Sequence, residues 1–259
     1  MDETLFRFGD GGALFGAYHP PLHGAGAEAA VLFCPPFAEE KKCSYRTFVR
    51  AARAFAAAGV ACVRFDYFGT GDSEGDFRQF SPRRATDDVT AAAAKARELS
   101  GASRTLLLGL RLGGTLALAA APRAGAHRVI LWQPVLDGAA FFNRTIQRQM
   151  LRKQLIGGPG AAPADNDAVI DLDGFPLSRA AADEIRSLDA LALADAFAGP
   201  VSLLQISHNE TPSRESRRLI DALGDRLTFT VVRCEPFWNR IDLADTTPVI
   251  ERTVSWLKG

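Results

Sequence analysis

The chain has 259 residues, and 47% of them are hydrophobic, which is enough to bury one large core. Thirty basic and thirty acidic side chains give a formal net charge of zero at pH 7. This balance excludes a global electrostatic attraction to nucleic acid or to an anionic membrane.

The cysteines and the apolar runs exclude further classes. Four cysteines in a chain of this length form no disulfide framework, and none of their spacings is that of a zinc site, so we expect no metal and no cofactor. Met1–Gly12 lacks the apolar segment of a signal peptide, and no run approaches the ~20 apolar residues of a membrane span. We expect a bacterial-type cytoplasmic protein without a transmembrane segment, although a peripheral membrane association stays open.

Along the chain, short apolar runs alternate with longer amphipathic stretches. The short runs predict strands over Thr4–Phe8, Ala13–His19, Ala29–Cys34, Val60–Tyr67, Arg104–Leu108, Arg128–Gln133, Val201–Ser207 and Leu227–Arg233. The longer stretches predict helices over Ser44–Ala58, from an N-capping Ser81 to about Leu99, and over Leu112–Ala121, Arg214–Leu223 and Pro248–Lys258.

This alternation predicts an α/β fold in which one mostly parallel, eight-stranded sheet has helices on both faces. The first two strands are expected to form its antiparallel edge. We expect the whole chain, 1–259, to be a single domain.

The stretch Leu136–Pro200 interrupts the alternation. It combines a basic, helix-like segment, Arg144–Leu155, with a turn rich in Gly, Pro and Ala at Gly157–Ala164. We interpret an insertion at about 138–199 as a small lid over the ends of the strands, because long excursions in compact domains usually carry function. A surface excursion with no role in binding is the alternative.

The most informative segment is Arg104–Leu118, which contains a strand, a sharp turn and a helix in that order. Gly109 and Gly113 flank its central residue with the G-x-S-x-G spacing of the nucleophile elbow in α/β-hydrolases, where small residues let the helix pack close to the strand. The turn presents its central side chain at the carboxyl ends of the strands, where open α/β sheets bind ligands. The spacing therefore predicts an α/β-hydrolase fold.

The central residue of this turn is Arg111, which has no hydroxyl group and is a poor nucleophile. The loop after the last predicted strand, Cys234–Asn239, contains no histidine, although such enzymes carry their catalytic base there. His208 and Glu210 lie in the loop that normally carries the acid. They offer a rewired acid–base pair, or else they are surface residues of a polar loop.

Further motifs accompany the arginine at the elbow. They are Pro36–Lys41 followed by Ser44 and Arg46, the run Arg64–Phe77, and the segment Glu235–Trp238. With them the chain resembles the α/β-hydrolase-like proteins associated with the exosortase A system, especially the second type, over nearly its whole length, including Asp173–Ser178. Arginine at the elbow is a shared feature of that type. Pro35 departs from the pattern, because relatives tend to have a histidine there.

The resemblance implies a hydrolase-like fold of the serine-aminopeptidase-like or esterase-like sort. It also implies a bacterial setting linked to exopolysaccharide production and protein sorting. It implies no catalytic triad, because the motif of that type itself lacks the serine.

Arg111 is expected at the N-terminal end of the following helix, where backbone N–H groups and a planar guanidinium attract a carboxylate or a phosphate. Glu39 and Glu40 arrive in the loop after the third strand. Because a buried arginine needs a partner, one glutamate either pairs with Arg111 and closes the site, or acts as general acid or base beside an arginine that orients an anionic group. The expected substrate-binding residues around them are Phe37, Leu112, Trp238 and Glu235.

Other side chains have structural interpretations. Cys34 is expected to be a small buried filler and Ser44 an N-cap. Arg64 is expected to pair with Asp66 or Asp72, which tie the loop after the fourth strand to its neighbours.

Three functions remain open. The leading hypothesis is a protein that binds an anionic small molecule, or an acyl or glycan intermediate, in an exopolysaccharide- or exosortase-linked pathway without serine chemistry. The second is an ester or thioester hydrolase in which Glu40 or His208 activates water. The third is a non-catalytic scaffold for an export assembly. No nucleic-acid partner is expected, and the oligomeric state is not predicted.

Overall fold

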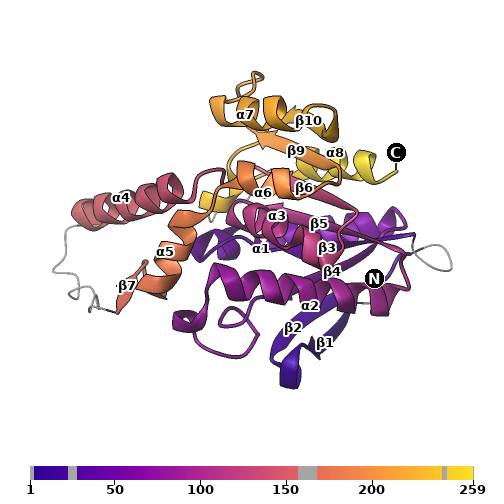
Figure 1. The fold of residues 1–259 in the computed structure, drawn as a ribbon, viewed down its shortest axis with the longest axis horizontal. Helices are drawn as coiled ribbons and strands as arrows, with labels where there is room; N and C mark the ends of the chain where they lie inside the picture. The colour runs from indigo at the N-terminus through magenta and orange to yellow at the C-terminus, as the bar shows by residue number, and fades with distance from the viewer. Residues whose placement is uncertain (1–2, 23–27, 157–167, 241–243, 259) are drawn as a thin grey trace.

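In the computed structural model, residues 3–22, 28–156, 168–240 and 244–258 are described. An eight-stranded sheet runs through the molecule in the order β1-β2-β4-β3-β5-β6-β9-β10 (Figure 1). The strands are β1 (Thr4–Phe8), β2 (Leu14–His19), β3 (Ala29–Cys34), β4 (Ala61–Asp66), β5 (Arg104–Leu110), β6 (Arg128–Trp132), β9 (Val201–Ile206) and β10 (Leu227–Val232). β1 and β2 pair antiparallel, β2 is antiparallel to β4, and the remaining pairs are parallel, so the predicted sheet and its antiparallel edge are confirmed.

Helices cover both faces of this sheet, as the alternation of elements predicts. They are α1 (Glu39–Ala57), α2 (Pro82–Ser100), α3 (Leu112–Ala124), α4 (Gly138–Ile156), α5 (Arg179–Ser187), α6 (Ala190–Ala196), α7 (Arg214–Leu223) and α8 (Thr247–Lys258). One buried cluster joins the sheet to α2, α3, α6 and α7, and a second joins it to α1 and α8. Side chains of β3 alternate between the two clusters, because successive residues of a strand point to opposite faces.

The segment between β6 and β9 holds α4, α5, α6 and a two-stranded hairpin of β7 (Val169–Asp171) and β8 (Pro176–Ser178). Figure 1 shows α4 extending away from the body of the molecule. The helix begins at Gly138 and is therefore longer than the predicted Arg144–Leu155. The predicted turn at Gly157–Ala164 lies outside the described residues.

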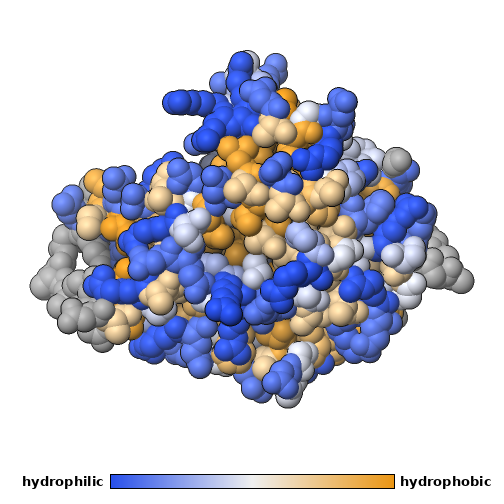
Figure 2. All heavy atoms as spheres, in the orientation of Figure 1, coloured by the Kyte–Doolittle hydropathy of each residue, from blue (hydrophilic) through white to orange (hydrophobic). Residues whose placement is uncertain are grey.

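The surface is mixed, as the balanced composition suggests. Figure 2 shows polar side chains spread over one face, with hydrophobic ones gathered between α6 and α7. Within the described ranges, no helix is both long enough and apolar enough to cross a membrane.

The start of α1 corrects the predicted helix. The helix begins at Glu39, not at Ser44, after a turn in which Ala38 has φ 50° and ψ −125°. Glutamates in a first turn are favoured by the helix dipole, which supports the earlier start. Ser44 is consequently not an N-cap: it is buried inside the helix, where its hydroxyl donates to the Glu40 carbonyl oxygen over 2.7 Å.

The expected partner of Arg64 is also corrected. Arg64 Nη2 lies 3.1 Å from Glu3 Oε1, and its Nε donates to His19 Nε2 over 3.0 Å. Asp66 instead pairs with Lys41 of α1 at 2.6 Å and accepts the Asp72 N–H over 2.9 Å. Ala17 of β2 stands opposite Arg64, and the Arg64 side chain reaches along the same face of the sheet to His19, two residues further along β2.

The turn between β5 and α3 depends on small residues. A Cβ on Gly109 would collide with the backbone of Gly113 and Gly114, and one on Gly113 would collide with the Cys34 and Pro35 carbonyl oxygens. The close approach of helix and strand inferred from the G-x-x-x-G spacing is therefore present.

We expect Gly113→Ala to lower the free energy of unfolding by about 3 kcal/mol, because backbone atoms on a neighbouring strand cannot move aside for the added methyl group. Gly101→Ala is the comparison: it occupies open space at φ 66° and should cost only about 1 kcal/mol of backbone strain. Urea unfolding of both variants measures the difference. Equal losses would contradict a steric requirement at the turn.

A second prediction concerns Asp88, whose carboxylate accepts the Phe68 N–H over 2.9 Å. Burial raises the pKa of Asp88 from 3.8 to about 6. The folded protein therefore holds this proton more tightly than the unfolded chain, and its contribution to stability is lost as the pH rises from about 4 to above 6. At about 1.4 kcal/mol for each pKa unit, this loss is at most about 3 kcal/mol.

Asp88→Asn keeps an acceptor for Phe68 but does not titrate, so its free energy of unfolding should change less than that of the wild type between pH 4 and pH 7. Urea unfolding at several pH values tests this. Asp195→Asn, at an exposed position of α6, should keep the wild-type pH dependence. An Asp88→Asn curve parallel to the wild type would show that the carboxyl group does not titrate as expected.

Candidate functional site

Arg111 occupies the turn between β5 and α3, as predicted. Its backbone has φ 54° and ψ −126°, a region that L-residues rarely adopt. The turn is held by the Arg111 N–H, which donates to the Trp132 carbonyl oxygen, and by the Arg111 carbonyl oxygen, which accepts from the N–H groups of Gly114 and Val135. This geometry is that of a nucleophile elbow, with a guanidinium at its tip.

The guanidinium is paired with Glu40 of α1. Arg111 Nε lies 3.2 Å from Glu40 Oε1, and both side chains are almost buried, at 13% and 12% exposure. Arg111 Nη1 also donates to the Gln133 carbonyl oxygen over 3.3 Å. The rings of Trp238 and Phe141 lie 5.2 and 5.8 Å from the guanidinium carbon, within the range of cation–π contacts.

The second oxygen of Glu40 is left without a partner. Glu40 Oε2 is buried and has no hydrogen bond within the described structure. Burial raises the pKa of Glu40, and the neighbouring Arg111, with a smaller effect from Arg148, opposes that rise. The carboxyl group is therefore held closer to its neutral form than an exposed glutamate.

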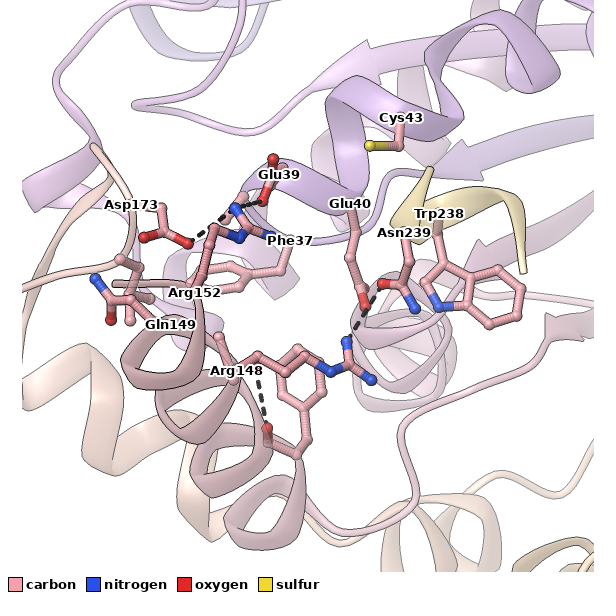
Figure 3. A pocket seen from close by; sticks show the side chains of 14 residues that line it. Phe37, Glu39, Glu40, Cys43, Arg148, Gln149, Arg152, Asp173, Trp238 and Asn239 are labelled. Carbon is pink, nitrogen blue, oxygen red and sulfur yellow. Dashed lines mark hydrogen bonds and ion pairs between the residues drawn. The ribbon is translucent and has the colours of Figure 1, made fainter. Parts of the chain in front are cut away.

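A pocket of about 420 Å³ is lined by Glu40, the partner of Arg111, among other residues (Figure 3). Its walls come from the first turn of α1, from α4, from the β7–β8 hairpin and from the segment after β10. The apolar lining residues are Phe37, Phe141, Leu172 and Trp238. α4 thus forms one wall of the cavity.

The charged residues of the pocket are unequally paired. Arg152 of α4 lies 3.2 Å from both Glu39 and Asp173. Arg148, one turn earlier, donates to Asn239 Oδ1 over 3.4 Å, and no carboxylate lies within 4 Å of it in the described ranges. Figure 3 shows Arg148 and Asn239 beside the Glu40 carboxylate.

The structure brings together some of the residues expected from the sequence. Phe37, Glu39, Glu40 and Trp238 line the pocket. Of the two candidate partners of Arg111, Glu40 makes the contact, whereas Glu39 points to α4. Leu112, the first residue of α3, is fully buried. Its expected part in substrate binding stays a prediction.

The other predicted residues form a separate group. His208 Nε2 lies 2.9 Å from Glu235 Oε1, and Arg240 lies 3.2 Å from the other oxygen of Glu235. His208 and Glu235 are about half exposed, Glu210 is exposed, and none of the three is among the described residues that line the pocket. The loops after β9 and β10 therefore carry a histidine–carboxylate pair in which the histidine follows β9 and the acid follows β10.

Several pocket residues were not expected as site residues. Arg148, Asp173 and Asn239 line the cavity together with Phe141. The basic segment Arg144–Leu155 contains Arg148, but a solvated helix face explains such a segment equally well. Across the described chain, no three His, Cys, Asp or Glu residues are grouped as a metal site would require. Cys34 is fully buried, and burial raises its pKa, in agreement with a filler role.

Comparison with known proteins adds the family. Residues 12–168 match the family model of serine aminopeptidase, S33. The chain belongs to this serine aminopeptidase family. The chain differs from a serine enzyme at the elbow, where Arg111 occupies the central position between Gly109 and Gly113.

Solved structures show the same fold at low sequence identity. Est1E from Butyrivibrio proteoclasticus, solved with ferulic acid, is 17% identical, with a TM-score of 0.66 over 95% of this chain and 94% of that chain. DcsB, solved with a substrate analogue, is 16% identical, with a TM-score of 0.69 over 99% of both chains. Alpha/beta hydrolase domain-containing protein 10 from mouse is 15% identical, with a TM-score of 0.58 over 100% and 97%. A search of curated protein sequences finds no match.

The buried ion pair predicts strong coupling between its two members. We expect Arg111→Met and Glu40→Met each to lower the free energy of unfolding by about 3 kcal/mol, because each leaves an unpaired charge in a nearly buried place. The double variant should lose much less than the sum, since an apolar pair of similar volume replaces the ions. Urea unfolding of the four proteins gives the coupling. Additive losses would show that the two side chains do not depend on each other.

Proposed function

We propose that this member of the serine aminopeptidase family is a binding protein that has no serine-dependent acyl transfer. The observation that carries the proposal is the ion pair of Arg111 and Glu40 at the elbow. A guanidinium supplies no alkoxide, and the remaining histidine–carboxylate pair is exposed and away from the pocket lining. The catalytic triad is, in this proposal, degenerate.

The ligand in this proposal is a small molecule with an anionic group and an apolar body. Arg148 supports the anionic group, because it presents a guanidinium to the pocket without a carboxylate partner in the described chain. Phe37, Phe141 and Trp238 support the apolar body. In this proposal Arg111 does not anchor the anion, because it is paired with Glu40.

The pathway is inferred from the motifs alone. The arginine at the elbow and the segments Arg64–Phe77 and Glu235–Trp238 support an assignment to an exosortase A-linked or exopolysaccharide pathway, in which the ligand is an acyl or glycan-type intermediate. A cytoplasmic location belongs to the same proposal.

One observation favours a second candidate, an ester or thioester hydrolase. Glu40 combines a raised pKa with an oxygen that has no partner among the described residues, and general acids and bases are commonly prepared in this way. In that function Glu40 would activate water while Arg111 orients the substrate.

Two measurements separate these functions. Wild-type protein should not hydrolyse p-nitrophenyl esters or thioesters above the buffer rate, and it should bind 3-phenylpropionate, an aromatic body with a carboxylate, by isothermal titration calorimetry. Arg148→Gln should weaken this binding about tenfold, which equals about 1.4 kcal/mol, because the carboxylate loses its cation. Arg144→Gln removes the same charge from α4 outside the pocket lining and should bind like the wild type.

Wild-type turnover that disappears in Glu40→Gln would establish the hydrolase and overturn the binding proposal. The binding proposal would equally fail if 3-phenylpropionate did not bind, or if Arg144→Gln weakened binding as much as Arg148→Gln.

A further inference from the structure

We propose that the ligand carries a hydroxyl group next to its anionic group, and that this hydroxyl bonds Glu40 Oε2 while the anion bonds Arg148. The pocket would thus select hydroxy acids with an apolar substituent. This inference rests on the proposed binding function and adds the chemical class of the ligand.

The first argument is the unmet hydrogen bond of Glu40. Its Oε1 accepts from Arg111 Nε, whereas Oε2 is buried without a partner in the described chain. A buried acceptor that is left unsatisfied destabilises the free protein, and more so when it is charged. A ligand group that fills this position would recover that cost on binding.

The second argument is the weak contact that stands beside this oxygen. Arg148 and Asn239 are both exposed, and their hydrogen bond is long, at 3.4 Å. They come from opposite walls, α4 and the segment after β10, and Figure 3 shows both next to the Glu40 carboxylate. A ligand can separate them at small cost and thereby reach Oε2.

The third argument selects a hydroxyl over other donors. Because burial raises the pKa of Glu40, its protonated form has to be considered beside the carboxylate. Oε2 is then either a carboxylate oxygen or the hydroxyl of a carboxylic acid. A hydroxyl both donates and accepts and therefore satisfies either form, whereas an ammonium group satisfies only the carboxylate. An ammonium group would also approach the guanidinium of Arg148, which has no carboxylate partner among the described residues and repels it.

The positions of Glu40 and Arg148 then indicate the chemical class of the ligand. The Arg148 guanidinium and the Glu40 carboxylate lie at the same place in the pocket lining, as Figure 3 shows, so the groups that they bind lie close together on the ligand. A carboxylate with a hydroxyl on the adjacent carbon meets this condition. The rings of Phe37, Phe141 and Trp238 accommodate an aromatic or aliphatic substituent within a cavity of about 420 Å³.

The test compares two probes that differ by one hydroxyl group. The enantiomers of 3-phenyllactate and the parent 3-phenylpropionate are titrated into the full chain by calorimetry at pH 7.5. We expect one enantiomer to bind the wild type about tenfold more tightly than 3-phenylpropionate, the gain of one hydrogen bond to a charged group. In the double variant Arg111→Met/Glu40→Met, which leaves no lone buried charge, both probes should bind equally.

Two controls locate the effect. Glu251→Gln removes a carboxylate from α8 outside the pocket lining and should keep the tenfold preference. Cys43 lines the pocket and is partly exposed, whereas the other three cysteines are buried. Bound phenyllactate should therefore slow alkylation of Cys43, measured at pH 8.5 because burial raises the pKa of this thiol.

Equal affinity of the wild type for all probes would overturn the hydroxyl inference and leave the proposed function standing. A preference that survives in the double variant, or binding that leaves Cys43 unprotected, would also overturn the inference. If no probe binds, the proposed function fails with it.

Discussion

A cation buried at a strained turn determines the arrangement of the site. The backbone at Arg111 cannot move away, because the strand and helix on either side are packed through glycines without space for a Cβ. Its charge must therefore be neutralised where it stands. Glu40 supplies the opposite charge, the Gln133 carbonyl oxygen accepts a further hydrogen bond, and the rings of Phe141 and Trp238 face the guanidinium. The pocket is built beside this neutralised centre and not upon it.

Much of the fold follows from periodicity. The eight strands and five of the helices lie where apolar runs and amphipathic stretches predict them, within a few residues at most boundaries. The start of α1 could not be predicted in this way, because no capping side chain marks it and the turn at Ala38 depends on its surroundings. That boundary decides which glutamate reaches Arg111, since residues 39 and 40 point in different directions on a helix.

The site was less accessible to sequence reasoning. The motifs indicated Arg111 and Glu40, and a buried arginine needs a partner. Whether a glutamate closes the site or acts as an acid or base beside Arg111 stayed open from the sequence. Arg148 and Asn239 contribute to the pocket only through the way in which α4 and the segment after β10 pack, and no local pattern records such packing. The sequence shows His208 in the loop that normally carries the acid and Glu235 in the loop that normally carries the histidine. It does not show that the two form an exposed pair apart from the pocket lining.

Three consecutive residues at the start of α1 form ion pairs with three different parts of the molecule. Glu39 meets Arg152 of α4, Glu40 meets the elbow, and Lys41 meets β4. Dissolved ions screen exposed pairs far more strongly than buried ones, and Glu39 and Arg152 are 42% and 50% exposed. Rising ionic strength should therefore weaken the contact between Glu39 and Arg152 first, while Glu40 and Lys41 keep α1 fixed to the elbow and the sheet. The ion pair at the rim of the cavity is thus more sensitive to salt than the two that hold its framework.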